Sequence, residues 1–287
     1  MNKYARQRVT DCGFLPLMRK LVFILSVGLV TTSPESSHLR AQDSSADDSS
    51  SVSEEKDWLE YYYENPTPER FVDQMKDWAE DGTLESDHAK PALIAFTSQV
   101  LRQNRERIEE WYDALSGLTP EQMQVIHTGM LYSRTTEADD LMRDRFGKAY
   151  EEQKEETPKI LELPLDRVDT MDMVWGFFYA TGSEGAIRRV VTCFRFRDAP
   201  DKPPGVDVPE GYKPLYKELP EFALGSLVSN ASRHPRIIEI LKEMYANDKS
   251  LLEMEREGVY EVLSELDPKA FPPKESKGDA VSKGDAV

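Results

Sequence analysis

The sequence predicts an all-α protein, and three observations lead to this fold class. Apolar residues recur at spacings of three and four from about Trp58 to Phe271, which places them on one side of successive helices. Glycine, proline and capping residues separate these runs. No segment alternates apolar and polar residues over a useful length, as a half-buried strand would. The patterns predict a fold, but they indicate no particular reaction or ligand.

The stretch from Phe96 to Leu131 predicts three consecutive short amphipathic helices. Asn104 is expected to end the first helix or to cap the next, and Gly117 to close the second helix in the left-handed conformation. Thr119–Gln122 (Thr-Pro-Glu-Gln) has the signature of a capping box that opens the third. Helices this short must bury their apolar sides against one another, which predicts antiparallel packing with short connections. The apolar positions are Leu93, Phe96, Val100 and Leu101, then Ile108, Trp111, Tyr112 and Leu115, then Met123, Ile126 and Met130.

Before this stretch, the spacing of Trp58, Tyr61 and Tyr62 fits one face of a helix. The turn Asn65–Pro68 follows, and Thr67 is expected to cap the next helix. That helix should bury an apolar stripe and end at Gly82. Its stripe consists of Phe71, Met75 and Trp78.

After the central stretch, the pattern predicts a short helix from Thr136 to Phe146 that ends at Gly147. Residues 148–169 are ambiguous. Two apolar runs around the compact turn Gly182–Gly185 then predict a helical hairpin, with Ser183 as the cap of its second helix. The two runs are Met171, Val174, Trp175 and Phe178, then Ile187, Val190, Val191 and Phe194.

Six prolines interrupt the helical pattern over residues 198–220, so we expect a long loop there, either functional or a simple connection. Helical patterns resume after it, and His234-Pro235 marks a boundary between two helices. The chain therefore predicts a single helical domain over residues 57–271, built from successive antiparallel helical hairpins. The arrangement could be an α-solenoid-like stack or an irregular helical bundle, because no fixed-period repeat selects one of them.

The two ends of the chain have a different composition from the predicted domain. Residues 1–41 contain basic residues before a run of about ten apolar residues, Leu21–Val30, which is typical of a signal peptide; an uncleaved N-terminal anchor is the alternative. Residues 42–56 are rich in Ser, Asp and Glu and predict a disordered spacer. Residues 272–287 predict a disordered tail with a repeated Ser-Lys-Gly-Asp-Ala-Val motif. We therefore expect a periplasmic or secreted protein.

The net charge disfavours some classes of partner, and the cysteine content argues against an internal disulfide. The formal net charge of −17 disfavours binding to nucleic acid, and membrane contact is expected only through an uncleaved N-terminal segment. Cys12 lies in the predicted signal segment, which leaves Cys193 alone and without an internal disulfide. Cys193 falls in an apolar helical pattern, so we expect a buried small side chain.

The sequence contains none of the common catalytic or metal-binding motifs, and we predict no catalytic residues, no metal site and no cofactor. His88, His127 and His234 lack ligand spacing and are expected to be structural. The pairs Asp139-Asp140 and Glu109-Glu110 are expected to lie on solvated helix faces.

Aromatic residues are concentrated in the first half of the chain. Most have the spacing of a packed core, but they cannot all share one face, so some aromatic surface is expected to be available for binding. The candidate binding residues are Tyr61, Tyr62, Tyr63, Trp78 and Trp111.

Two groups of residues resemble motifs of a group of exported helical proteins of Gram-negative-type bacteria that has no assigned activity. The first is Tyr61–Phe71 (Tyr-Tyr-Tyr-Glu-Asn-Pro-Thr-Pro-Glu-Arg-Phe) with Phe96, Arg102–Asn104, Ile108 and Trp111; the second is Ser229–Ala231 with His234-Pro235. The resemblance covers about residues 57–250. It implies an exported helical protein and assigns no site residues.

These observations favour a non-enzymatic exported helical protein that acts as a protein-interaction or scaffolding module of the cell envelope. One alternative is a helical hydrolase-like enzyme whose site is assembled from dispersed Asp, Glu and His residues, with His127, Asp139 and Asp140 as first candidates. Another is a small-ligand or glycan-binding protein that uses the aromatic half. A protein partner is expected, and the sequence does not predict an oligomeric state.

Overall fold

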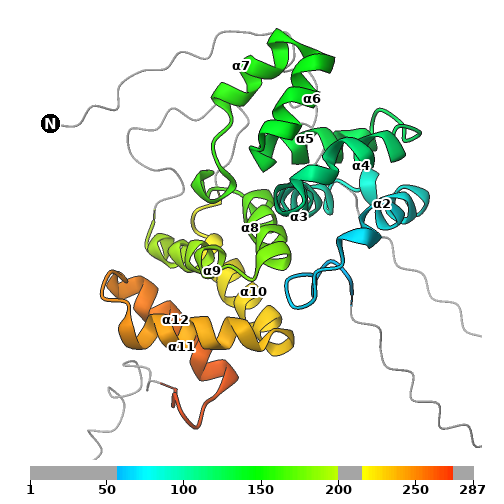
Figure 1. Cartoon of the computed structure of the whole chain (residues 1–287). Helices are drawn as coiled ribbons and strands as arrows, with labels where there is room; N and C mark the ends of the chain where they lie inside the picture. Colours follow the sequence, from blue (N-terminus) through cyan, green and yellow to red (C-terminus); the bar gives the residue numbers. More distant parts are fainter. Residues whose placement is uncertain (1–56, 200–214, 274–287) are drawn as a thin grey trace, which may run out of the picture. The chain divides into compact units, whose positions relative to one another are not determined.

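The computed structural model describes residues 57–199 and 215–273, all within a compact unit that begins at Asp57 (Figure 1). These residues form eleven α-helices and five short 3-10 helices and no strand, which confirms the all-α prediction. The predicted signal segment, spacer, most of the proline-rich loop and nearly all of the tail lie outside the described residues. Within the described ranges, no helix is long and apolar enough to cross a membrane.

The α-helices are α2 (Phe71–Glu80), α3 (Lys90–Gln103), α4 (Ile108–Ala114), α5 (Met123–Ser133), α6 (Thr136–Phe146), α7 (Lys148–Glu156), α8 (Val168–Thr181), α9 (Glu184–Val191), α10 (Leu219–Arg233), α11 (Pro235–Asn247) and α12 (Glu253–Leu266). The 3-10 helices are η1 (Pro68–Arg70), η2 (Thr83–Glu85), η3 (Arg105–Arg107), η4 (Ile160–Glu162) and η5 (Thr192–Phe196).

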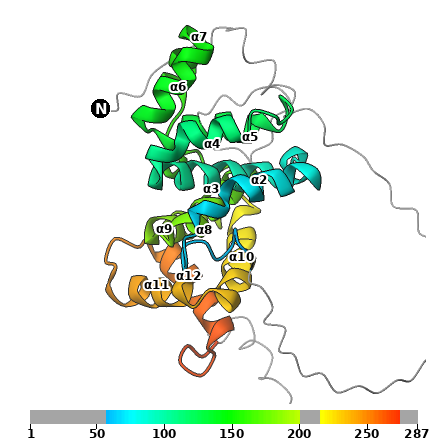
Figure 2. The ribbon, with the colours of Figure 1, turned by 45° about the vertical axis from the view of Figure 1, so that its right-hand side comes forward.

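Helix α3 is the central element of the first group of helices and packs against both α5 and α8 (Figures 1 and 2). It is buried without interruption from Ala95 to Leu101, as expected for a helix covered on several sides. Small residues on its neighbours permit close approach. A Cβ atom on Gly129 of α5 would lie 2.7 Å from the Thr97 methyl carbon, and Gly176 of α8 lies against Ala92.

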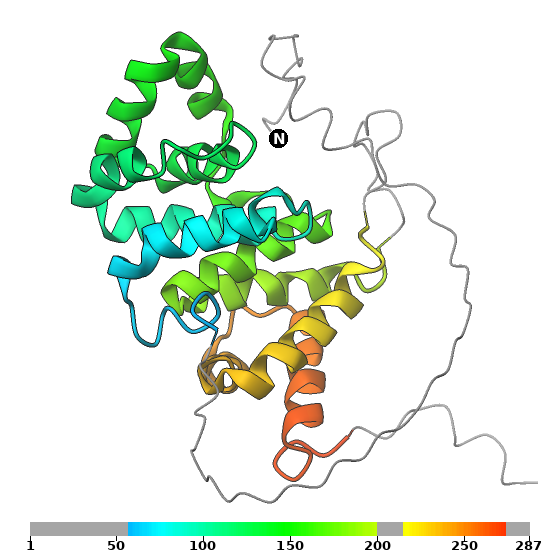
Figure 3. The same cartoon turned by 90° about the vertical axis from the view of Figure 1, so that its right-hand side faces the viewer.

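Helices α10, α11 and α12 contact one another and pack on α9 and η5 (Figure 3). Gly258 of α12 lies directly against the Phe194 ring. Near it, the Glu255 carboxylate is fully buried, 2.6 Å from Arg195 Nε and 3.8 Å from Arg188 Nη2. Its Oε2 accepts a hydrogen bond from the Leu252 amide at 2.9 Å, which closes the first turn of α12. Buried Glu255 therefore joins three elements.

Local signals set several helix boundaries where the sequence predicts them. Helix α6 has the predicted bounds, and Gly147 follows it with φ 56°. Ser183 Oγ accepts a hydrogen bond from the Gly185 amide and caps α9. The capping box before α5 is present, with the Thr119 amide 3.0 Å from Gln122 Oε1 and the Gln122 amide 3.3 Å from Thr119 Oγ1.

Other local predictions are wrong, and in each case a contact or a backbone angle gives the reason. Residues 58–64 form turns rather than a helix, because Asp57 Oδ1 accepts the Leu59 and Glu60 amides. Thr67 is the N-cap residue of η1, as predicted, but its Oγ1 accepts the Trp58 indole N–H at 2.8 Å and forms no hydrogen bond with an amide of the helix. Gly117 does not have a positive φ.

The ambiguous and interrupted regions are also more helical than the sequence indicates. Residues 148–169 contain α7 and η4. Helix α10 begins inside the predicted loop, with Pro220 in its first turn. Amides of the first turn have no acceptor within the helix, so a proline there removes no helical hydrogen bond. Cys193 is fully buried, as predicted, and burial raises the pKa of its thiol to about 12.

Candidate functional site

Residues 57–65, which we call the aromatic segment, contact α8 and the α10–α11 junction through a set of rings around His234. The His234 imidazole is fully buried. Ring centroids lie 4.6 Å away for Tyr61, 5.7 Å for Tyr179, 5.8 Å for Tyr63 and 6.0 Å for Phe178. These five residues form the His234 cluster, which brings together residues 171 positions apart in the chain.

Protein groups contact the three tyrosine hydroxyls of the His234 cluster and His234 Nδ1. Tyr63 Oη lies 3.3 Å from His234 Nδ1, and the Tyr63 amide donates to the Tyr179 carbonyl at 3.0 Å. The Tyr61 hydroxyl donates to the Arg233 carbonyl, and the Tyr179 hydroxyl to Asn230 Oδ1 at 2.6 Å.

Beside the cluster, Arg233 Nη1 lies 2.5 Å and 2.6 Å from the two carboxylate oxygens of Glu60. Burial raises the pKa of Tyr179 well above its usual range, and the Glu60 carboxylate adds to this effect. Burial also raises the pKa of Tyr63, and the adjacent Glu64 raises it further. Both phenols therefore remain neutral hydrogen-bond donors at physiological pH, and neither is suited to act as a base.

The five predicted binding residues lie in three places. Tyr61 and Tyr63 are half-buried in the His234 cluster. Tyr62 is buried and Trp78 half-buried in a second ring cluster with Trp58 and Phe96.

Trp111 belongs to the core and joins neither group. Its ring centroid lies 4.6 Å from that of Phe71, and the Arg107 guanidinium lies 4.8 Å from the Trp111 ring centroid. Of the five candidates, Tyr62 and Trp111 thus fill the interior, and Tyr61, Tyr63 and Trp78 are half-buried.

The candidate acid–base residues are not brought together. His127 Nε2 bonds the Tyr112 hydroxyl at 2.9 Å, and burial, with Arg145 nearby, lowers the pKa of His127. Asp139 instead contacts two residues of α7, with the Tyr150 hydroxyl at 2.5 Å and Lys154 Nζ at 2.6 Å.

The other acidic candidates lie at the surface. Asp140 pairs with Arg143 in an exposed contact. Glu109 and Glu110 are exposed on α4. None of these side chains forms an arrangement in which one could act as a base toward another.

Asp172 of α8 is a titratable residue that the sequence pattern does not single out. Burial raises its pKa to about 6, Asp169 contributes in the same direction, and the exposed His88 opposes them. One helical turn further on, the Trp175 indole N–H is buried without a hydrogen-bond partner.

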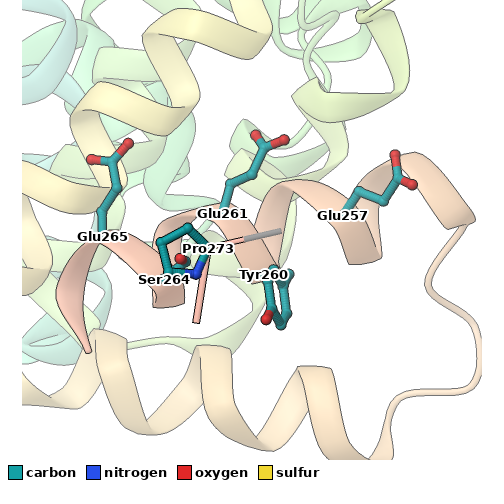
Figure 4. A pocket seen from close by; sticks show the side chains of 6 residues that line it. All are labelled: Glu257, Tyr260, Glu261, Ser264, Glu265 and Pro273. Atoms are coloured by element: carbon teal, nitrogen blue, oxygen red, sulfur yellow. The ribbon is translucent and has the colours of Figure 1, made fainter. Parts of the chain in front are cut away.

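A hollow of about 540 Å³ lies along α12 and is lined by Glu257, Tyr260, Glu261, Ser264, Glu265 and Pro273 (Figure 4). The three glutamates are four residues apart and project from the same side of the helix. Arg197 forms a two-bond contact with Glu261, at 2.7 Å and 3.0 Å. Glu257 and Glu265 have no ion-pair partner among the described residues. The four-residue spacing of Glu257, Glu261 and Glu265 is visible in the sequence, but the sequence pattern was not used to predict this surface.

No group of three or more His, Cys, Asp or Glu side chains in the described ranges is arranged to hold a metal ion. Comparison with known proteins finds no matching family model, no matching curated protein and no matching solved structure.

Proposed function

We propose that this chain is an exported, non-enzymatic helical protein that binds another protein of the cell envelope, and that the α12 hollow contacts a basic segment of that partner. The hollow carries the proposal: its volume of about 540 Å³ can accept a few side chains, and it presents two unpaired carboxylates. Lysine or arginine side chains are the complementary groups. Tyr260 adds an aromatic wall.

The separation of the candidate acid–base residues supports a binding rather than a catalytic role. His127 bonds a tyrosine and Asp139 pairs with a lysine, so both are engaged in contacts that stabilise the fold. Export remains supported by the basic-then-apolar pattern of residues 1–41.

The role of the hollow can be tested with a photo-crosslinking residue at position 264 of the full chain, expressed in its native cell. One dominant protein adduct is expected at position 264, and it should not form from position 109, an exposed site on α4. Failure to form a specific adduct, or equal adducts from both positions, would contradict the proposal.

Charge dependence can be tested with a matched pair of variants. The double variant Glu257→Gln/Glu265→Gln and the control Glu109→Gln/Glu110→Gln remove the same number of charges from exposed helix positions. Only the first should weaken binding of the cross-linked partner, once purified, by about tenfold at low salt. Equal effects of the two variants would point to the net charge of the protein rather than to the hollow.

A further inference from the structure

One wall of the α12 hollow is held in position by contacts within the protein. The Tyr260 hydroxyl donates to the Pro272 carbonyl at 2.6 Å. The Tyr260 ring centroid lies 5.7 Å from that of Tyr245 on α11 and 5.9 Å from that of Phe271, which follows α12. Because this side chain is already ordered, a partner that contacts it pays little conformational entropy there.

One of the three glutamates of the hollow already has a cationic partner. Arg197, the residue after η5, donates one hydrogen bond to each carboxylate oxygen of Glu261, at 2.7 Å and 3.0 Å. Glu257 and Glu265 lie on either side of Glu261, are exposed, and have no ion-pair partner among the described residues (Figure 4). The helix face therefore binds a guanidinium at its centre and presents one unpaired carboxylate at each end.

We propose that the α12 hollow recognises an extended partner segment with two arginine side chains about 12 Å apart, one for Glu257 and one for Glu265. This inference rests on the proposed function and specifies the chemistry of the partner. The two glutamates are eight residues apart in α12, which corresponds to about 12 Å along a helix that rises about 1.5 Å per residue. Four residues of an extended chain cover about 13 Å, so arginines four positions apart match this separation.

The size of the hollow favours an extended segment over a helix. A helix with its side chains is about 10–12 Å across, so two turns of it need more space than about 540 Å³. An extended segment can instead place only its side chains in the hollow.

Arginine fits this surface better than lysine. The contact between Arg197 and Glu261 shows that a guanidinium can donate two hydrogen bonds to a carboxylate on this helix face. Guanidinium groups also stack on aromatic rings, and Tyr260 contributes a ring to the lining of the hollow. We therefore expect the partner to bind through arginine side chains.

Labelled polyproline peptides with two arginines two, four or eight positions apart test this spacing on the full chain at low salt. Polyproline rises about 3.1 Å per residue, so the arginines lie about 6, 12 and 25 Å apart. Fluorescence anisotropy should show that the four-position peptide binds at least about threefold more tightly than the other two. Replacing its arginines by lysines should weaken binding by about twofold.

A pair of variants connects the preferred spacing to the hollow. Glu265→Gln should remove the preference for the four-position peptide, and the control Glu109→Gln, at an exposed position on α4, should keep it. The proposal is overturned if no peptide binds, if all three bind equally, if the eight-position peptide binds most tightly, or if the preference survives Glu265→Gln.

Cross-linking from position 264 separates this inference from the proposed function. A specific protein adduct without a spacing preference among the peptides overturns only the two-arginine inference. Failure to form an adduct contradicts the proposed function itself. An adduct between position 264 and residues 274–287 of the same chain would place the chain's own tail in the hollow and overturn both.

Discussion

Gly176 of α8 lies so close to Ala92 of α3 that a Cβ atom on Gly176 would be 2.0 Å from the Ala92 carbonyl oxygen. The obstructing atom is backbone, so it cannot move aside as a side chain would. The crossing of these two helices therefore depends on a glycine, although glycine is a poor residue for a helix interior.

We expect Gly176→Ala to lower the free energy of unfolding by about 3 kcal/mol, because α3 and α8 must separate to accept the methyl group. Urea unfolding of the full chain measures this. Gly225→Ala is the matched control: Gly225 lies in the interior of α10, and nothing lies within 4 Å of the position that a Cβ atom would occupy there, so the helix should gain about 0.5–1 kcal/mol. Equal effects of the two substitutions would exclude the proposed close contact.

The buried Glu255 carboxylate predicts a second stability effect. Glu255→Gln should cost about 2 kcal/mol, since the fully buried side chain loses its charge-assisted contact with Arg195 at 2.6 Å, whereas Arg188 keeps Asp248 as a partner at 2.7 Å. Glu257→Gln, an exposed position on the same helix, should change stability by less than about 0.5 kcal/mol. Thermal unfolding of both variants checks the difference, and a wild-type melting temperature for Glu255→Gln would contradict it.

Asp172 predicts a dependence of stability on pH. Burial raises the pKa of Asp172 in the folded protein to about 6, above the value of about 3.9 for a solvated aspartate. Its contribution to the free energy of unfolding is therefore most favourable below about pH 4, and this contribution is lost as the pH rises through 6. Asp172→Asn should therefore stabilise the protein at pH 7.5 by about 1 kcal/mol, a value reduced for partial exposure, and give little gain near pH 4. Asp77→Asn, at an exposed position on α2, should show no such difference between the two pH values.

Removal of either of two neighbouring buried hydroxyls on α3 should change the free energy of unfolding, but in opposite directions. Thr97 Oγ1 is buried without a hydrogen-bond partner, so Thr97→Val, which keeps the shape, should raise the free energy of unfolding by about 1 kcal/mol. Ser98 Oγ donates to the Ala95 carbonyl at 2.7 Å and accepts from Gln99, so Ser98→Ala should lower it by about 1 kcal/mol. Urea unfolding measures both changes, and loss of stability in Thr97→Val would imply that its hydroxyl is satisfied, for instance by water.

Features encoded by a few neighbouring residues could be predicted from the sequence. The spacing of apolar residues defined the helical class, and Gly147, Ser183 and His234-Pro235 marked helix boundaries correctly. These signals are local because a cap or a left-handed residue acts on amides and carbonyls within one turn. Residues 58–64 were mispredicted because the Asp57 side chain and long-range ring contacts override their helical spacing.

The relationships that define the candidate sites depend on residues far apart in the chain, and only the tertiary structure determined them. The sequence identified Tyr61 and Tyr63 as candidates and His234 as a helix boundary, but it could not place them in contact across 171 residues. Nor could it show that Gly176 meets a backbone carbonyl or that Glu255 is buried. The periodicity of a helix defines which side is buried, whereas the partner of that side depends on how all the helices pack together.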